Sequence, residues 1–229
     1  MKTAGLIGGI SWVSTMEYYR LLNETIAQQF GGNVSAPLLI YSFNYSRVLE
    51  HTFKEDWDGV TVLFTEAAQK LQQSGADCLV LCANTAHLVA PHVQQAVSIP
   101  IISIVDATTA EVINKGLKKV LLLGTRFTMT KAFYKEKLEA AGVEVMIPDA
   151  EDMNFIHRTI FDELGKGIYT EPTKAKYISI INKLAAQGAE GVLFACTEIP
   201  LIIKPEEVSI PSFDTTAIHV KEIAEFMTS

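Results

Sequence analysis

The chain has 229 residues, and its 19 lysines and arginines against 26 aspartates and glutamates give a formal charge of −7. This acidic balance argues against a nucleic-acid partner, because neutralising phosphates requires clustered Lys and Arg. No apolar stretch approaches the roughly 18 residues of a membrane helix, and the N-terminus lacks a signal-peptide pattern. The three cysteines, Cys78, Cys82 and Cys196, do not form a disulfide framework, so a reduced, cytoplasmic location is expected.

Short apolar runs alternate with longer amphipathic stretches along the whole chain. In chain order, the expected strands are Thr3–Ile7, Leu38–Tyr41, Cys78–Leu81, Val120–Leu123, Glu144–Ile147 and Gly191–Ala195. The expected helices are Thr15–Phe30, Gly59–Ser74, Ala86–Val97, Ala107–Lys115, Thr130–Ala141, Met153–Leu164, Thr173–Gln187 and Thr216–Met227. Such alternation predicts an α/β fold in which helices flank parallel sheets on both faces.

The sequence also repeats itself once. The segment LQQSGAD at 71–77 is echoed by LAAQGAE at 184–190, and Ser98-Ile99-Pro100 is echoed by Ser209-Ile210-Pro211. Two further echoes keep the same order along the chain. We therefore expect two similar α/β lobes related by a pseudo-twofold axis, with a site between them. The first lobe is expected at 1–103 plus 211–229 and the second at 104–210; the alternative is chance similarity among βαβ units.

Polar clusters lie at the expected ends of four strands, where open parallel sheets bind ligands. They are Gly8–Thr15, Cys82–Thr85, Gly124–Thr128 and Cys196–Glu198. Hydroxyl, amide and backbone N–H groups at helix starts favour a carboxylate ligand. Cys196 stands where a helix start lowers a thiol pKa, which would make it a base or nucleophile. Cys78 lies within a strand and is expected to be a buried apolar residue.

Other candidates carry weaker signals. The five histidines show no metal-ligand spacing with cysteines or carboxylates, so no metal site is expected. Arg47, Arg126 and Lys166 lie in or near predicted loops and could bind a second substrate carboxylate. Each of these three is alternatively a solvated surface charge.

At these clusters the chain resembles the aspartate/glutamate racemase superfamily. The segment VLFACTEIP at 192–200 matches the family's second cysteine signature, and the segments at 5–12, 84–87 and 123–128 support the match. The resemblance implies a homodimer that uses neither pyridoxal phosphate nor metal, with one cysteine on each face of the substrate α-carbon. The expected catalytic residues are Cys196 and Cys82. The expected substrate-binding residues are Ser11, Asn84, Thr85, Thr128, Thr197 and Glu198, with Arg126, Arg47 and Lys166 as further candidates.

The first cysteine motif departs from the family form, which is Cys-Asn-Thr. Here it is Cys82-Ala83-Asn84-Thr85, and the internal repeat pairs Ala83, not Cys82, with Cys196. A one-residue bulge would bring Cys82 into the site. Without a bulge, alternation of side chains turns Cys82 away and leaves Cys196 alone, with water or a threonine serving the other face. The second arrangement predicts unequal handling of the two enantiomers.

The function expected from the sequence is cofactor-independent racemisation of a small amino acid, most directly aspartate or glutamate. The thiolate would remove the α-proton, and hydroxyl and amide donors would stabilise the charge that develops on the carboxylate. Two alternatives stay open. One is a single-cysteine decarboxylase of an arylmalonate-like acid, and the other is a non-catalytic amino-acid binding module. The preferred amino acid and enantiomer are left open.

Overall fold

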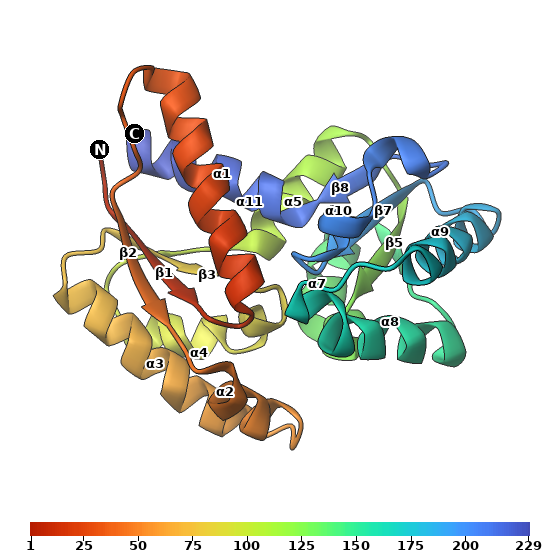
Figure 1. Ribbon diagram of the computed structural model, residues 1–229, viewed down its shortest axis with the longest axis horizontal. Helices are drawn as coiled ribbons and strands as arrows, with labels where there is room; N and C mark the ends of the chain where they lie inside the picture. Colours follow the sequence, from red (N-terminus) through yellow and green to blue (C-terminus); the bar gives the residue numbers. More distant parts are fainter. The chain divides into compact units, whose positions relative to one another are not determined.

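The computed structural model describes all residues from Met1 to Ser229, which form two compact units (Figure 1). Unit 1 comprises Met1–Ser103 and His219–Ser229, and unit 2 comprises Ile104–Ile218. Each unit contains a parallel four-stranded sheet flanked by helices, as the strand–helix alternation predicted. The α/β fold class is therefore confirmed.

In unit 1 the strand order is β2-β1-β3-β4. The strands are β1 (Ala4–Gly8), β2 (Leu38–Ser42), β3 (Cys78–Leu81) and β4 (Ile101–Ile102). One sheet face packs against α1 (Trp12–Phe30) and the C-terminal part of α11 (Thr215–Thr228). The other face is covered by α2 (Tyr45–Thr52), α3 (Trp57–Gln73), the 3-10 helix η1 (Thr85–Leu88) and α4 (Ala90–Gln95). Both central strands, β1 and β3, are therefore buried on both faces.

Unit 2 repeats this arrangement with the strand order β6-β5-β7-β8. Its strands are β5 (Lys119–Gly124), β6 (Glu144–Met146), β7 (Gly191–Ala195) and β8 (Ser212–Asp214). One face packs against α6 (Arg126–Thr130), α8 (Ala150–Asp162), η2 (Leu164–Lys166), α9 (Glu171–Ala185) and α10 (Ile199–Ile202). The other carries α5 (Ile104–Asn114) and α7 (Ala132–Ala140), and η3 (Pro205–Glu207) precedes β8. Strand for strand, β1, β2, β3 and β4 correspond to β5, β6, β7 and β8.

The structure differs from the sequence-based expectation at several points. The edge strands β4 and β8 were not predicted, because two or three residues show no recognisable period. The short helix α2 was missed, whereas the helix start expected after Cys196 is present as α10. The expected helix 86–97 is divided between η1 and α4, the expected helix 130–141 is present as α7, and α6 was not predicted. The second boundary lies later along the chain than the expected 210/211, since β8 pairs with β7 and unit 2 extends to Ile218.

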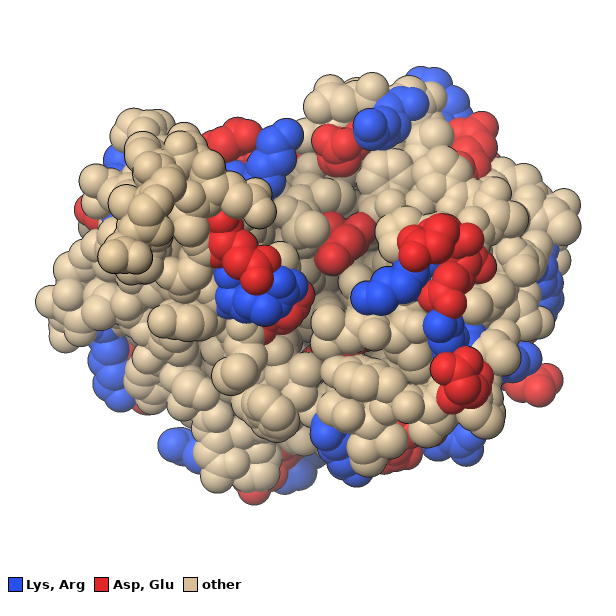
Figure 2. All heavy atoms as spheres, turned by 45° about the horizontal axis from the view of Figure 1, so that its top comes forward, with Lys and Arg blue, Asp and Glu red and all other residues tan.

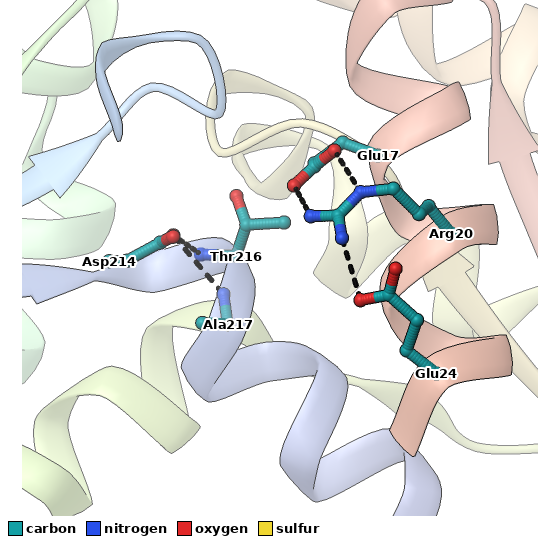
Figure 3. Close-up of polar contacts among 6 residues, drawn as sticks. All are labelled: Glu17, Arg20, Glu24, Asp214, Thr216 and Ala217. Atoms are coloured by element: carbon teal, nitrogen blue, oxygen red, sulfur yellow. Dashed lines mark hydrogen bonds and ion pairs between the residues drawn. The ribbon is translucent and has the colours of Figure 1, made fainter. Parts of the chain in front are cut away.

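The surface carries charges of both signs. Arg20 of α1 forms ion pairs with Glu17 and Glu24, at helical spacings of three and four residues (Figure 3). On the face shown in Figure 2, acidic and basic side chains are interspersed and form no broad basic patch. None of the helices combines the length and apolar character that crossing a membrane requires.

Candidate active site

Parallel pairing brings the polar clusters of each unit together at one sheet edge. In unit 1, β1 and β3 pair in register at Ile7 and Leu81, so the segments 8–15 and 82–85 start side by side. In unit 2, β5 and β7 pair at Gly124 and Ala195, so 125–128 and 196–198 are neighbours in the same way. Each unit therefore presents two of the predicted clusters at the carboxyl edge of its sheet.

The Cys196 thiol is held against a carboxylate. Cys196 Sγ donates a hydrogen bond to Glu198 Oε2 over 3.0 Å, and Thr197 Oγ1 donates to the same oxygen over 2.8 Å. The chain turns after β7, where the Ile199 N–H donates to the Cys196 carbonyl, and this turn brings residues 196 and 198 together. All three residues are buried. Glu198 is thus the hydrogen-bond acceptor of the Cys196 thiol.

Burial raises the pKa of the Cys196 thiol well above its ordinary value, and the charge and hydrogen bond of Glu198 raise it further. The backbone N–H of Glu198 acts in the opposite direction. The sequence-based expectation of a lowered thiol pKa is therefore wrong. The following helix, α10, has only four residues and a proline in its first turn, so it supplies little dipole. Cys196 is a neutral thiol unless Glu198 takes its proton.

Cys82 points into the core of unit 1. It is fully buried in an apolar cluster with Leu6, Tyr18 and Val80, and burial raises its pKa. Its backbone N–H donates to the Ile7 carbonyl, so the ladder continues past β3 without a bulge. Strand alternation then directs the next residue, Ala83, to the opposite side, where it is partly exposed. Of the two arrangements left open by the sequence, the side chains adopt the one that turns Cys82 away.

Ser11 belongs to a turn fixed by its own hydrogen bonds. Its side chain caps α1 by accepting from the Ser14 N–H over 3.4 Å, and its carbonyl accepts from Thr15 Oγ1. Thr15 Oγ1 in turn accepts from the Gly9 N–H over 2.8 Å. Gly9 has a φ of 75°, and a Cβ there would lie 2.4 Å from the backbone of Phe43. The turn is therefore closely fitted against the segment that follows β2.

The second cluster of unit 1 joins the first through Ser14. Ser14 Oγ donates to the Cys82 carbonyl over 2.6 Å. Asn84 is buried and Thr85 is half-buried at the start of η1. The His87 side chain donates from Nδ1 to the Ala83 carbonyl over 3.1 Å. Ser11, Asn84 and Thr85 are thus held in one hydrogen-bonded region of unit 1.

In unit 2, Thr128 is fully buried, and its N–H donates to the Thr125 side chain that caps α6. Arg126 is exposed, and its guanidinium lies 5.5 Å from the centre of the Phe127 ring. The Arg126 N–H donates to His157 Nδ1 over 3.1 Å. Two of the backbone donors at this helix start are therefore already engaged, which reduces its capacity for an anion.

Arg47 and Lys166 lie on the surfaces of different units. Arg47 is exposed in α2, and Lys166 is exposed at the end of η2. Within its own unit, each is a solvated charge on a short helix.

Several residues of this region were missed by the sequence analysis. His157 contacts Arg126 from 31 positions away, and Ser14 reaches Cys82 from 68 positions away. No local pattern marks contacts of this kind, because the sheet register creates them. The three cysteines are unpaired, and no group of three or more His, Cys, Asp or Glu side chains is placed to hold a metal ion.

Comparison with known proteins gives consistent matches. A family model described as Asp/Glu/Hydantoin racemase matches residues 7–223. The broad specificity amino-acid racemase RacX of Bacillus subtilis is 25% identical over 224 residues, which cover 95% of this chain and 94% of RacX. Among solved structures, a candidate Asp/Glu racemase from Yersinia pestis is 41% identical with a TM-score of 0.91, and an aspartate racemase homologue from Pyrococcus horikoshii is 37% identical with a TM-score of 0.86. Both cover 100% of either chain.

Proposed function

Because the chain belongs to the Asp/Glu/hydantoin racemase family, we propose that it inverts the α-carbon of a small amino acid, most directly aspartate or glutamate, with Cys196 as the proton carrier. The observation that carries the proposal is the buried hydrogen bond from the Cys196 thiol to Glu198. A thiol is a weak base until its proton is removed, and here the acceptor is already in place.

The proton balance follows from this pair. Glu198 takes the thiol proton, and the Cys196 thiolate then takes the α-proton of the substrate, leaving a carbanion whose charge spreads into the carboxylate. Donors from Ser11, Asn84, Thr85, Thr128 and Thr197 are proposed to bind the substrate and stabilise that charge. Return of a proton to the opposite face completes inversion. The extra proton on the Cys196–Glu198 pair then leaves to solvent.

Cys82 is not assigned a catalytic role in this proposal. The Cys82 side chain is buried on the opposite face of the sheet from Ala83, and the Ala83 methyl group has no acidic proton. We propose that water supplies the proton on the face that Cys196 does not serve. The kcat/KM for inversion must then be the same for both enantiomers, because the equilibrium constant between them is one. The asymmetry instead appears in exchange without inversion, whose rate should differ between the enantiomer whose α-proton faces Cys196 and the enantiomer whose α-proton faces water.

Proton NMR in D₂O, with L- and D-aspartate and L- and D-glutamate offered separately, tests the proposal. We expect loss of the α-proton signal together with loss of optical activity, and one enantiomer should exchange faster than it inverts. Cys196→Ser should abolish both processes, and Cys82→Ser should preserve them. Absence of exchange from all four substrates would overturn the proposed substrate class.

Glu198 also bears on substrate choice, since the family resemblance associates Cys-Thr-Glu with aspartate and broad-specificity enzymes. Arg47, Arg126 and Lys166 remain the proposed partners of a second carboxylate. Replacing each by methionine should raise KM for aspartate more than KM for alanine if it binds that group. An unchanged ratio of the two KM values would remove that residue from the proposal.

A second candidate reaction is favoured by the single available thiol. A decarboxylase of an arylmalonate-like acid needs one proton donor, and the neutral Cys196 thiol fits that role. Carbon dioxide release from phenylmalonate, with no exchange from amino acids, would support this alternative. Amino-acid binding with neither reaction would instead indicate a binding module.

The assembly and location belong to the same proposal. The homodimer implied by the family resemblance is tested by light scattering of the full chain. The reduced, cytoplasmic location accords with the three unpaired cysteines.

A further inference from the structure

The chain passes between the two units at two points. One is Ser103–Ile104, directly after β4, and the other is Ile218–His219, inside α11. His219 Nε2 lies 2.9 Å from the Ile102 carbonyl. A carbonyl only accepts, so Nε2 carries the proton. One hydrogen bond therefore joins the residue just after the second crossing to a residue just before the first.

The other ring nitrogen fixes a third element. With Nε2 protonated in the neutral ring, Nδ1 is an acceptor, and Tyr18 Oη donates to it over 2.8 Å. Tyr18 and His219 are both fully buried, and their rings meet edge-on. Burial, with the nearby His87, lowers the pKa of His219 to about 3, so the ring is neutral at physiological pH. Its tautomer is set by α1 on one side and β4 on the other.

His87 extends this contact to the candidate site. The rings of His87 and His219 lie 5.9 Å apart in an edge-on arrangement, and His87 Nδ1 donates to the Ala83 carbonyl. Ala83 begins the segment that carries Asn84 and Thr85. A displacement of His219 would therefore displace this segment through the ring of His87, which packs between them.

Helix α11 is anchored on both sides of the crossing it contains. At its start, Asp214 accepts from the N–H groups of Thr216 and Ala217 over 2.8 and 3.1 Å (Figure 3). Beyond His219, the side chains of Val220, Ile223 and Met227 pack in the apolar core of unit 1.

We propose that His219 is a positioning residue that fastens the two chain crossings to each other and, through His87, holds the segment Ala83–Thr85. Hinges in two-unit proteins are commonly a few residues at the ends of elements. Here the two crossings cannot move independently while the bond from His219 to Ile102 is intact. A shift of the backbone at either crossing would move His219, and through His87 it would move Asn84 and Thr85.

Hydrogen exchange on the full chain without ligand tests the structural part. His219→Ala should accelerate amide exchange about tenfold or more in both 101–105 and 215–220, since local opening depends on the lost contacts. His219→Gln keeps an N–H donor and should restore part of the protection. Ile223→Ala is the matched control, because Ile223 is a fully buried residue of the same helix whose side chain makes no hydrogen bond to β4. Because Ile102 of β4 packs against the same apolar core, Ile223→Ala should accelerate exchange in 101–105 clearly less than His219→Ala does.

Two exchange results would overturn the proposal. One is an unchanged 101–105 segment in His219→Ala, and the other is an equal acceleration of that segment in Ile223→Ala. The consequence for turnover rests on the proposed function: KM should rise several-fold in His219→Ala, with kcat less affected and with partial rescue in His219→Gln. An unchanged KM would disprove the link to Ala83–Thr85. If the wild-type chain exchanges no α-proton, the proposed function fails, and hydrogen exchange still decides the role of His219.

Discussion

Cys196 Sγ and Glu198 Oε2 lie 3.0 Å apart in a buried turn, and the hydrogen bond between them places one proton between two bases. The thiol is the weaker acid because burial and the carboxylate charge both oppose its ionisation. In the proposed mechanism, the pair removes the substrate α-proton only after Glu198 has accepted the thiol proton. Glu198 is therefore expected to matter as much as the cysteine.

Glu198→Gln separates thiol acidity from turnover. The substitution removes the charge and the acceptor that raise the pKa of Cys196, so this pKa should fall, and alkylation by iodoacetamide at pH 8 should become faster. Exchange of the substrate α-proton should nevertheless fall by roughly 10²–10⁴-fold, because the proton acceptor is gone. Slower alkylation, or exchange at the wild-type rate, would contradict this assignment.

Ala83→Cys should restore a second thiol. Ala83 is partly exposed and occupies the place in unit 1 that Cys196 occupies in unit 2, so the added sulfur atom causes little overpacking. The expected result is faster inversion and a smaller excess of exchange over inversion. Cys82→Ser is the contrasting variant. It should leave exchange intact but lower the free energy of unfolding by about 1–3 kcal/mol, because a hydroxyl replaces a thiol in an apolar cluster.

His219 should make the protein sensitive to acid. Its pKa is about 3 in the folded chain, against an ordinary value of 6.5, so the unfolded chain binds more protons between these limits. Stability contributed by the neutral ring is complete above pH 6.5 and is lost as the pH falls towards 3. Between pH 6.5 and 4.5, the urea midpoint of unfolding should fall less steeply with pH in His219→Gln than in the wild type. Parallel profiles for the two proteins would disprove the assignment.

Asp152 should be the important carboxylate at the start of α8. Its side chain is only 5% exposed, and Lys176 and Lys183 donate to it over 2.7 and 2.9 Å. Burial alone would raise its pKa, but the two lysines lower it overall. Asp152→Asn should reduce the free energy of unfolding by about 1–3 kcal/mol. Asp149→Asn, at an exposed partner of Lys183, should shift the midpoint of the same urea titration much less, because solvent screens that ion pair.

Gly9 and Gly31 form a matched pair of positive-φ glycines. Their φ angles are 75° and 72°, but a Cβ at Gly9 would meet the Phe43 backbone at 2.4 Å, and a Cβ at Gly31 would meet nothing within 4 Å. Gly31→Ala should therefore cost only the strain of a positive φ combined with a ψ of 179°, about 1–3 kcal/mol. Gly9→Ala should cost clearly more in chemical denaturation and should also slow α-proton exchange by displacing Ser11. Equal losses of stability would contradict this account.

The sequence by itself determined the fold class and most of the regular elements. The long amphipathic helices and apolar central strands are repetitive enough to identify; for instance, β3 and β7 were predicted at their exact bounds. The internal repeat correctly anticipated two sheets of the same topology, because βαβ units leave a period that survives substitution. It also predicted that Ala83 corresponds to Cys196, because each lies the same number of residues after a glycine that ends a helix.

The tertiary structure decided what those residues face. The burial of Cys82 follows from the alternation of side chains past the end of β3. This alternation holds because the Cys82 N–H continues the hydrogen-bond ladder to the Ile7 carbonyl, and that bond joins distant segments of the chain. The raised pKa of Cys196 came from burial and from the charge and hydrogen bond of Glu198, whereas the position of Cys196 before a helix start had suggested a lowered pKa. No local pattern marked the contacts among His219, His87 and Tyr18. Their contacts arise because α11 returns to unit 1, and such long-range packing is set by the whole chain and not by any single segment of it.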